Sequence, residues 1–152
     1  KMILDTGAEI ALSGLFGALI AQILKFIVYL IKNRHINFKI LSTTGGMPSS
    51  HSAMVSALTT SVGLVEGWWS PLFSVSLAFS LVVMYDAAGV RLAAGRMAAT
   101  LNKLVEDIYE NKGHTITKLK ELLGHTPKEV FAGAMLGIAI GLYFHYYLIK
   151  HM

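Results

Sequence analysis

Residues 10–31 read I-A-L-S-G-L-F-G-A-L-I-A-Q-I-L-K-F-I-V-Y-L-I, and this segment sets the class of the protein. At about 1.5 Å per residue, a helix of this length crosses a hydrocarbon core of roughly 30 Å. The segment therefore predicts a membrane-spanning helix. Gln22 and Lys25 share one face of that helix, which we expect to look into the protein rather than into lipid. The alternative for Lys25 is a side chain that reaches the membrane surface.

The composition of the whole chain is that of an integral-membrane protein. Of its 152 residues, 54% are hydrophobic and only 14% are charged, and the mean hydropathy is +0.57. These values are too apolar for an ordinary soluble domain. We expect one membrane-embedded domain over residues 1–152. Cysteine is absent, which excludes a disulfide framework and a thiolate metal site.

Three further apolar segments are expected to be membrane-embedded helices, at residues 52–65, 72–85 and 131–149, the first of them short for a full span. Residues 92–110 are amphipathic, which predicts a helix that lies on the surface or packs on the others. Residues 118–123 suggest one more short helical segment. The predicted fold class is an all-α integral-membrane bundle of about four embedded helices plus an amphipathic cytoplasmic helix.

The basic residues indicate the orientation in the membrane. The connectors 32–39 and 91–128 hold most of the lysine and arginine, whereas the turn 66–71 holds none. Both large connectors are therefore expected on the cytoplasmic face of an inner or plasma membrane. This bias already explains the basic pI, so we expect no nucleic-acid partner. One membrane face then gathers the candidate functional residues His51, Asp86, Arg91, His125 and Glu129.

The sequence G-G-M-P-S-S-H-S-A at residues 45–53 has the residue types of an anion-binding helix start. Its glycines let the backbone approach a ligand, its proline suits the beginning of a helix, and either serine next to it can cap the helix. Free N–H groups at such a start attract phosphate. His51 would stand beside the bound anion and exchange a proton with it. The alternative is a capped helix start whose histidine bonds only nearby backbone.

A second candidate motif is H-T-P-K-E-V at residues 125–130. Thr126 followed by a proline and then Glu129 matches a capping box, which gives Glu129 a structural role. A carboxylate four residues after His125 can also orient a nucleophilic histidine ring. Two histidines, a carboxylate and several cations at one membrane face suit phosphoryl transfer from a lipid. Asp86 and Arg91 are expected to form an ion pair or to bind separate partners.

These motifs resemble those of a known superfamily. P-S-S-H at residues 48–51 resembles the P-S-G-H motif of the type 2 phosphatidic acid phosphatases, which are related to the vanadium haloperoxidases. Residues 125–130, with Gly133 beyond, resemble the final motif, in which a histidine is followed four residues later by an aspartate. Together with Y-D-A-A-G-V-R at residues 85–91, the chain looks like the divergent phosphatidic acid phosphatase-like membrane proteins.

The resemblance implies a membrane lipid phosphatase that hydrolyses a phosphomonoester of the phosphatidic acid or polyprenyl phosphate type, without metal or cofactor. It implies a phosphohistidine intermediate on His125, with Glu129 as the orienting carboxylate and His51 as the acid toward the leaving group. The expected phosphate-binding residues are Ser49, Ser50, Lys25, Lys39 and Arg91, and the expected supporting residues are Asp86, Gly45 and Gly46.

The chain departs from the superfamily pattern at several positions. The superfamily has an arginine six residues before the nucleophilic histidine, but Leu119 stands there, and we infer that Arg91 supplies the missing charge. The motif glycine is replaced by Ser50, and the motif aspartate by Glu129. The superfamily's first motif is a lysine followed seven residues later by an arginine and then a proline. At this spacing the chain has only Lys25 and Lys32, and no proline follows, so Lys39 is an equal candidate for the motif lysine.

Three alternatives stay open at this point. The first is a catalytically silent phospholipid-binding or transport protein that retains the phosphate cradle. The second is a zinc or manganese site, since histidine with carboxylate is a reasonable ligand set; its ligands would be His51, Asp86, His125 and Glu129. The third concerns assembly, because the glycines at 133, 137 and 141 suit an internal helix contact and a homodimer equally well.

Overall fold

The computed structural model describes residues 7–34, 36, 46–109, 119 and 124–148. All elements within these ranges are helices, which confirms the all-α prediction. In chain order they are α1 (Gly7–Asn33), α2 (Ser50–Val65), α3 (Pro71–Ala88), α4 (Val90–Tyr109), α5 (Pro127–Tyr143) and the π-helical turn η2 (Phe144–Leu148). Among the described helices, three segments are long and apolar enough to cross a membrane: Gly7–Asn33, Pro71–Glu106 and Pro127–Tyr147.

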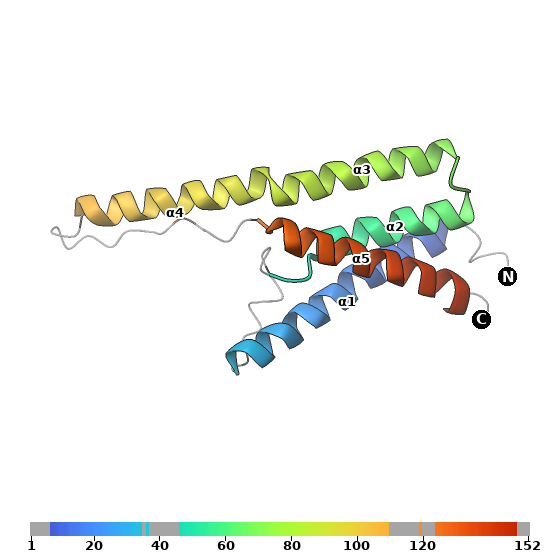
Figure 1. Ribbon diagram of the computed structural model, residues 1–152, viewed down its shortest axis with the longest axis horizontal. Coiled ribbons are helices and arrows are strands. Elements are labelled where there is room, and N and C mark those ends of the chain that lie inside the picture. Colours follow the sequence, from blue (N-terminus) through green and yellow to red (C-terminus); the bar gives the residue numbers. More distant parts are fainter. Residues whose placement is uncertain (1–6, 35, 37–45, 110–118, 120–123, 149–152) are drawn as a thin grey trace.

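The short helix α2 is the centre of the bundle, where it packs against α1, α3 and α5 (Figure 1). Its 16 residues make it shorter than the three candidate spans that surround it. Backbones approach closely because glycines of the neighbouring helices face it. A Cβ atom on Gly137 would lie 2.9 Å from the Ala57 amide nitrogen, and one on Gly141 would lie 2.9 Å from the Ala57 carbonyl oxygen. The glycine row of α5 therefore makes an internal helix contact.

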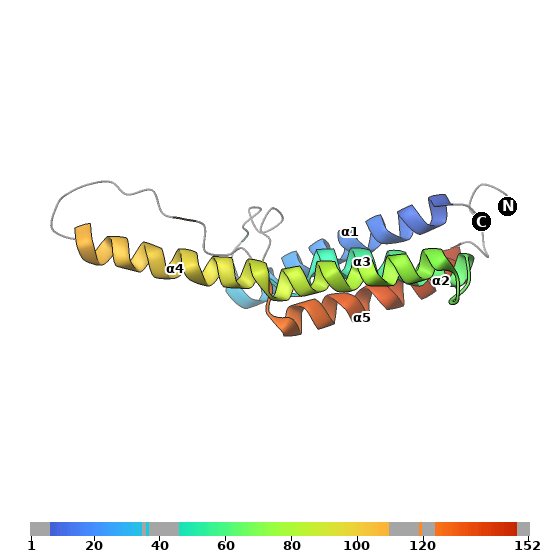
Figure 2. The same cartoon turned by 90° about the horizontal axis from the view of Figure 1, so that it is seen from above.

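The helices α3 and α4 form one long rod, interrupted only at Gly89 (Figures 1 and 2). The side chain of Ser70 caps α3 by accepting a hydrogen bond from the Phe73 N–H at 3.1 Å. The amphipathic helix was expected at residues 92–110 and begins at Val90. It extends away from the bundle, and its packing on the other helices is mainly at the end of α3.

A buried carboxylate lies at the end of the bundle where α1 begins. Glu9 is 1% exposed, and its Oε1 lies 2.7 Å from Nδ1 of His145 in η2. An ionisable group at membrane depth is costly unless it has a partner. The pair therefore ties the first described turn of α1 to the last described turn of the chain.

Replacing His145 with alanine is expected to destabilise the protein by about 3–5 kcal/mol, because it leaves the Glu9 carboxylate buried without its partner. Adding Glu9→Gln should recover much of this loss, since the double variant no longer buries an unpaired charge. Thermal unfolding of the two single variants and the double variant in detergent measures the coupling. Strictly additive losses would show that the two side chains do not interact energetically.

Candidate active site

Three segments that are far apart in the sequence meet where α2 and α5 begin and α3 ends. The Ser49 N–H donates to the Glu129 carbonyl at 3.1 Å, and the His125 N–H donates to the Ala87 carbonyl at 3.0 Å. Gly124 lies directly against the backbone of Leu92, where a side chain on residue 124 would collide. The sequence therefore brings all three motifs to one place through backbone contacts.

Glu129 makes the contacts that both of its expected roles would need. Its Oε2 lies 3.2 Å from Nδ1 of His125 and accepts the Thr126 N–H at 3.0 Å. Thr126 is the N-cap of α5, and Pro127 is the first helical residue, as the capping box predicts. The cap thus fixes the carboxylate that in turn fixes the histidine ring.

His125 is held in a form suited to nucleophilic attack. Its side chain is 3% exposed, and burial lowers its pKa from the usual value, while the hydrogen bond with Glu129 opposes that shift only in part. Burial therefore favours the neutral form of the ring. In the tautomer that directs its Nδ1 proton at Glu129, Nε2 carries the lone pair. This Nε2 is buried and has no hydrogen-bond partner among the described residues. A buried polar atom without a partner is rare and marks a place for a ligand.

Ser49 begins α2 as its N-cap, and Pro48 lies just before the helix rather than in its first turn. The buried Ser49 Oγ accepts the Ser52 N–H at 3.4 Å and the Ser52 hydroxyl at 3.1 Å. Its oxygen is thus engaged in capping. Ser50 is 7% exposed and stands at the first helical position, where backbone N–H groups have no partner within the helix. These groups and the positive end of the α2 dipole can receive an anion.

Lys25 reaches this helix start from the middle of α1. It is 2% exposed, and a Cβ atom on Gly46 would lie 3.4 Å from its Cδ. The expectation that Lys25 looks into the protein is confirmed, and the surface-reaching alternative is excluded. Gly46 has a φ of +100°, which favours glycine. Lys25 is also close enough to His125 and Glu129 for their charges to interact.

His51 lies in the first turn of α2 and is exposed. With Gln22 and Ser50 it lines a groove of about 390 Å³ between α1 and α2. Burial, and after it the positive charges of Arg91 and Lys25, lower the pKa of His51 from its usual value. A titratable side chain thus stands at the accessible edge of the helix start, where a proton donor toward a leaving group would be needed.

Arg91 is positioned by an ion pair with Asp86. The distance from Arg91 Nε to Asp86 Oδ2 is 2.6 Å, and both side chains are partly exposed. The ion-pair interpretation is therefore confirmed. Within the described ranges, no group of three His, Asp or Glu side chains is arranged to hold a metal ion.

Asn102 is a residue to which sequence reasoning gave no special role. Its side-chain amide accepts the Leu119 N–H at 2.8 Å and donates to the Leu119 carbonyl at 2.9 Å. The residue at the position of the superfamily arginine is therefore docked on α4 by its backbone. The signal in the sequence that could have pointed to this role is that Asn102 is a single amide side chain within an amphipathic helix. Lys39 and Gly45, named as site residues from the sequence, lie outside the described residues.

These features define a class: an all-helical membrane protein in which a histidine contacts a carboxylate at the start of the last described candidate membrane span. The model of the Divergent PAP2 family matches residues 7–140, so the chain belongs to that family. The chain is also 43% identical over 147 residues to the Uncharacterized membrane protein YuiD of Bacillus subtilis (strain 168), which covers 90% of this chain and 93% of the relative. No solved structure matches the chain.

Proposed function

We propose that this protein is a lipid phosphatase that hydrolyses a phosphomonoester of the phosphatidic acid or polyprenyl phosphate type. The observation that carries the proposal is the state of His125, whose Nδ1 faces Glu129 at 3.2 Å while its buried Nε2 has no partner among the described residues. An oriented, neutral imidazole with one nitrogen left for a ligand is what attack on phosphorus requires. Membership of the Divergent PAP2 family supports the same chemistry.

In the first step, the Nε2 lone pair of His125 attacks phosphorus while the ester P–O bond breaks. Glu129 stabilises the positive charge that the ring acquires. His51 donates a proton to the leaving oxygen, so the lipid departs as an alcohol and the phosphoryl group stays on His125. The N–H groups at the start of α2 and the Lys25 ammonium balance the charge of the phosphoryl oxygens.

In the second step, a water molecule attacks the phosphohistidine. His51, now neutral, accepts a proton from that water as the P–N bond breaks. Inorganic phosphate leaves, and His125 returns to its neutral form. The same histidine thus acts as acid in the first step and as base in the second.

We place the site at the cytoplasmic face. Within the described residues, the lysines and arginines all belong to the half of the structure in which α1 ends and α2 and α5 begin. They are Lys25, Lys32, Arg34, Arg91, Arg96, Lys103 and Lys128. The excess of basic residues on cytoplasmic segments supports this orientation.

A second candidate function is binding or transport of a phospholipid without hydrolysis. The observation in its favour is Leu119, which occupies the position of the superfamily arginine and is held on Asn102 through its backbone. A site with one cation fewer stabilises the transition state less, yet can still bind a phosphate.

The test is phosphate release from phosphatidic acid and from undecaprenyl phosphate by the purified protein in detergent with EDTA. Release, together with an acid-labile phosphoryl group trapped on the protein, is the expected result. Binding of the lipid phosphate without release would favour the second function. Release that depends on an added metal ion would overturn the phosphohistidine mechanism.

A further inference from the structure

The helix α4 exposes a continuous apolar row along the outside of the molecule. Val90, Met97 and Leu104 recur every seven residues, as do Leu101 and Ile108 beside them. Each of these five side chains is between 50% and 65% exposed. Residues at this spacing lie on one side of a helix, and an exposed apolar row of this length marks an interaction surface.

A different side of α4 is already covered by the chain itself. Gly95, Ala98 and Asn102 are buried, and Asn102 binds the Leu119 backbone in both directions. Leu119 therefore lies on that side of α4, away from the exposed apolar row. Among the described helices, α4 packs mainly on the end of α3, and the five side chains of the row stay exposed.

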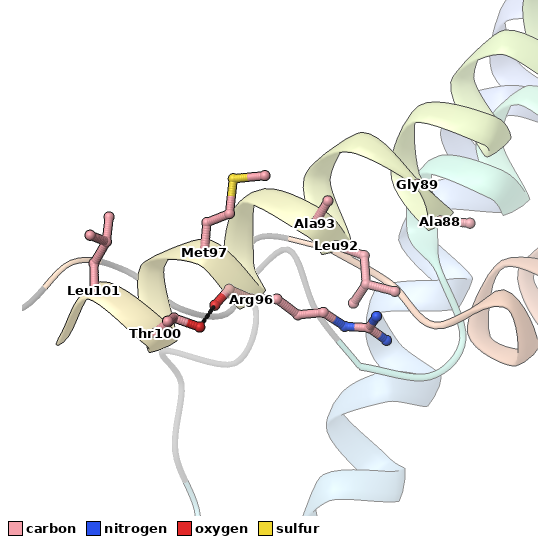
Figure 3. A pocket seen from close by; sticks show the side chains of 8 residues that line it. All are labelled: Ala88, Gly89, Leu92, Ala93, Arg96, Met97, Thr100 and Leu101. Atoms are coloured by element: carbon pink, nitrogen blue, oxygen red, sulfur yellow. Dashed lines mark hydrogen bonds between the residues drawn. The ribbon is translucent and has the colours of Figure 1, made fainter. Parts of the chain in front are cut away.

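Two cations run beside the apolar row. Arg96 and Lys103 are both exposed and also seven residues apart, so they lie on one side of the helix. A groove of about 740 Å³ lies between this cationic edge and the apolar row, lined by Arg96, Thr100, Met97, Leu101 and residues of the α3–α4 junction (Figure 3). All the lining residues belong to this one rod. The groove is therefore open on its other side, where a binding partner can contact it.

The position of α4 along the rod places it at a membrane surface. The 18 residues of α3 extend about 27 Å, close to the thickness of a hydrocarbon core. Trp69, which is 98% exposed, lies just before α3 and suits the opposite interface. The helix α4 therefore begins where α3 leaves the bilayer, at Gly89.

We propose that α4 is an interfacial helix that binds an anionic lipid surface, with the apolar row in the bilayer and Arg96 and Lys103 on lipid phosphates. This contact requires the rod of α3 and α4 to bend, and the break between the two helices at Gly89 is the place for it. Apolar residues bordered by cations match a surface of acyl chains beneath negative head groups. This proposal is independent of hydrolysis at His125.

A second copy of the chain fits the row less well. Two copies in one membrane share one orientation, so their rods would run parallel. Residues seven positions apart continue the line of the row toward α3. From Leu101 this line passes through Ala94, Ala87 and Ser80. Both of the last two are buried, and Ser80 bonds Thr59 of α2 at 2.6 Å. A parallel rod seated along the row would therefore collide with α2.

The test uses the absence of cysteine from the chain. The single variants Met97→Cys and Leu104→Cys carry a nitroxide label, with Glu106→Cys as an exposed control away from the apolar row. The full protein is placed in phosphatidylcholine vesicles with and without phosphatidylglycerol. Collision rates with oxygen, which concentrates in lipid, and with a water-soluble nickel complex are measured by electron paramagnetic resonance.

The expected result is a ratio of oxygen to nickel collision rates several-fold higher at Met97 and Leu104 than at Glu106 in vesicles that contain phosphatidylglycerol. The double change R96Q/K103Q should lower that ratio. A nickel-accessible label at both test positions would overturn the proposal. Spin–spin broadening that disappears on dilution with unlabelled protein would also overturn it, in favour of a second copy.

Discussion

Replacing His125 with alanine is expected to lower phosphate release by at least about 1,000-fold, because it removes the group that attacks phosphorus. The phosphoryl group trapped on the protein should disappear with it. Binding of the lipid phosphate should persist, since the start of α2 and Lys25 remain in place. Initial rates, trapped label and lipid binding are measured on the same preparation.

Two further variants sharpen this test. Glu129→Gln should lower the rate on the order of 100-fold or more, because a neutral amide no longer stabilises the charged ring. His114→Ala changes a histidine outside all three motifs and serves as the matched control. A His125→Ala protein that still releases phosphate at the normal rate would remove His125 from the mechanism and leave the mechanism without its nucleophile.

Replacing Gly137 with leucine is expected to destabilise the bundle by more than about 3 kcal/mol and to lower Tm by roughly 10 °C. A Cβ atom there would lie 2.9 Å from the Ala57 amide nitrogen and would collide with the Ala53 carbonyl oxygen. These are backbone atoms of a helix, which cannot move aside as a flexible side chain would. The helix α5 must therefore shift away from α2.

Ala139→Leu is the matched control for that change. It enlarges a side chain on α5 that is exposed rather than turned toward α2. Thermal unfolding followed by circular dichroism in detergent compares the two variants with the parent protein. Equal Tm values for Gly137→Leu and Ala139→Leu would show that the close approach of α5 to α2 contributes little to stability.

Local signals in the sequence predicted the helices well. The apolar run at residues 10–31 became α1 over Gly7–Asn33, and the capping box at Thr126 marked the start of α5. Each signal depends only on neighbouring residues. The first is the hydropathy of an apolar run, and the second is a side chain that accepts the free N–H groups at a helix start. Nothing distant in the chain is required to form them.

The geometry of the candidate site depends instead on contacts between distant segments. The sequence placed His125 and Glu129 in one motif, but the support of His125 by the Ala87 carbonyl needs the relative position of α3 and α5. The approach of Lys25 to Gly46 likewise depends on how the chain returns after α1. Spacing alone left Lys25 with two equal interpretations.

The pair of Glu9 and His145 shows the same limit most clearly. The two residues are 136 positions apart and belong to no motif. An acid near the start of the first span and a histidine near the end of the last span were the available signals. The pairing of Glu9 with His145 could have been predicted only from a topology that places both residues at one membrane face.

The hydroxyl groups buried along α2 affect how the protein enters the membrane. The helix carries Ser52, Ser56, Thr59, Thr60 and Ser61 at buried positions. A short segment with this many hydroxyls partitions poorly into lipid on its own, so it needs its neighbours as it leaves the translocation channel. One of those neighbours, α5, is synthesised last of the described spans and brings Glu129 with it. A chain that stops before α5 therefore leaves α2 without one of its main packing partners and His125 without the Glu129 carboxylate.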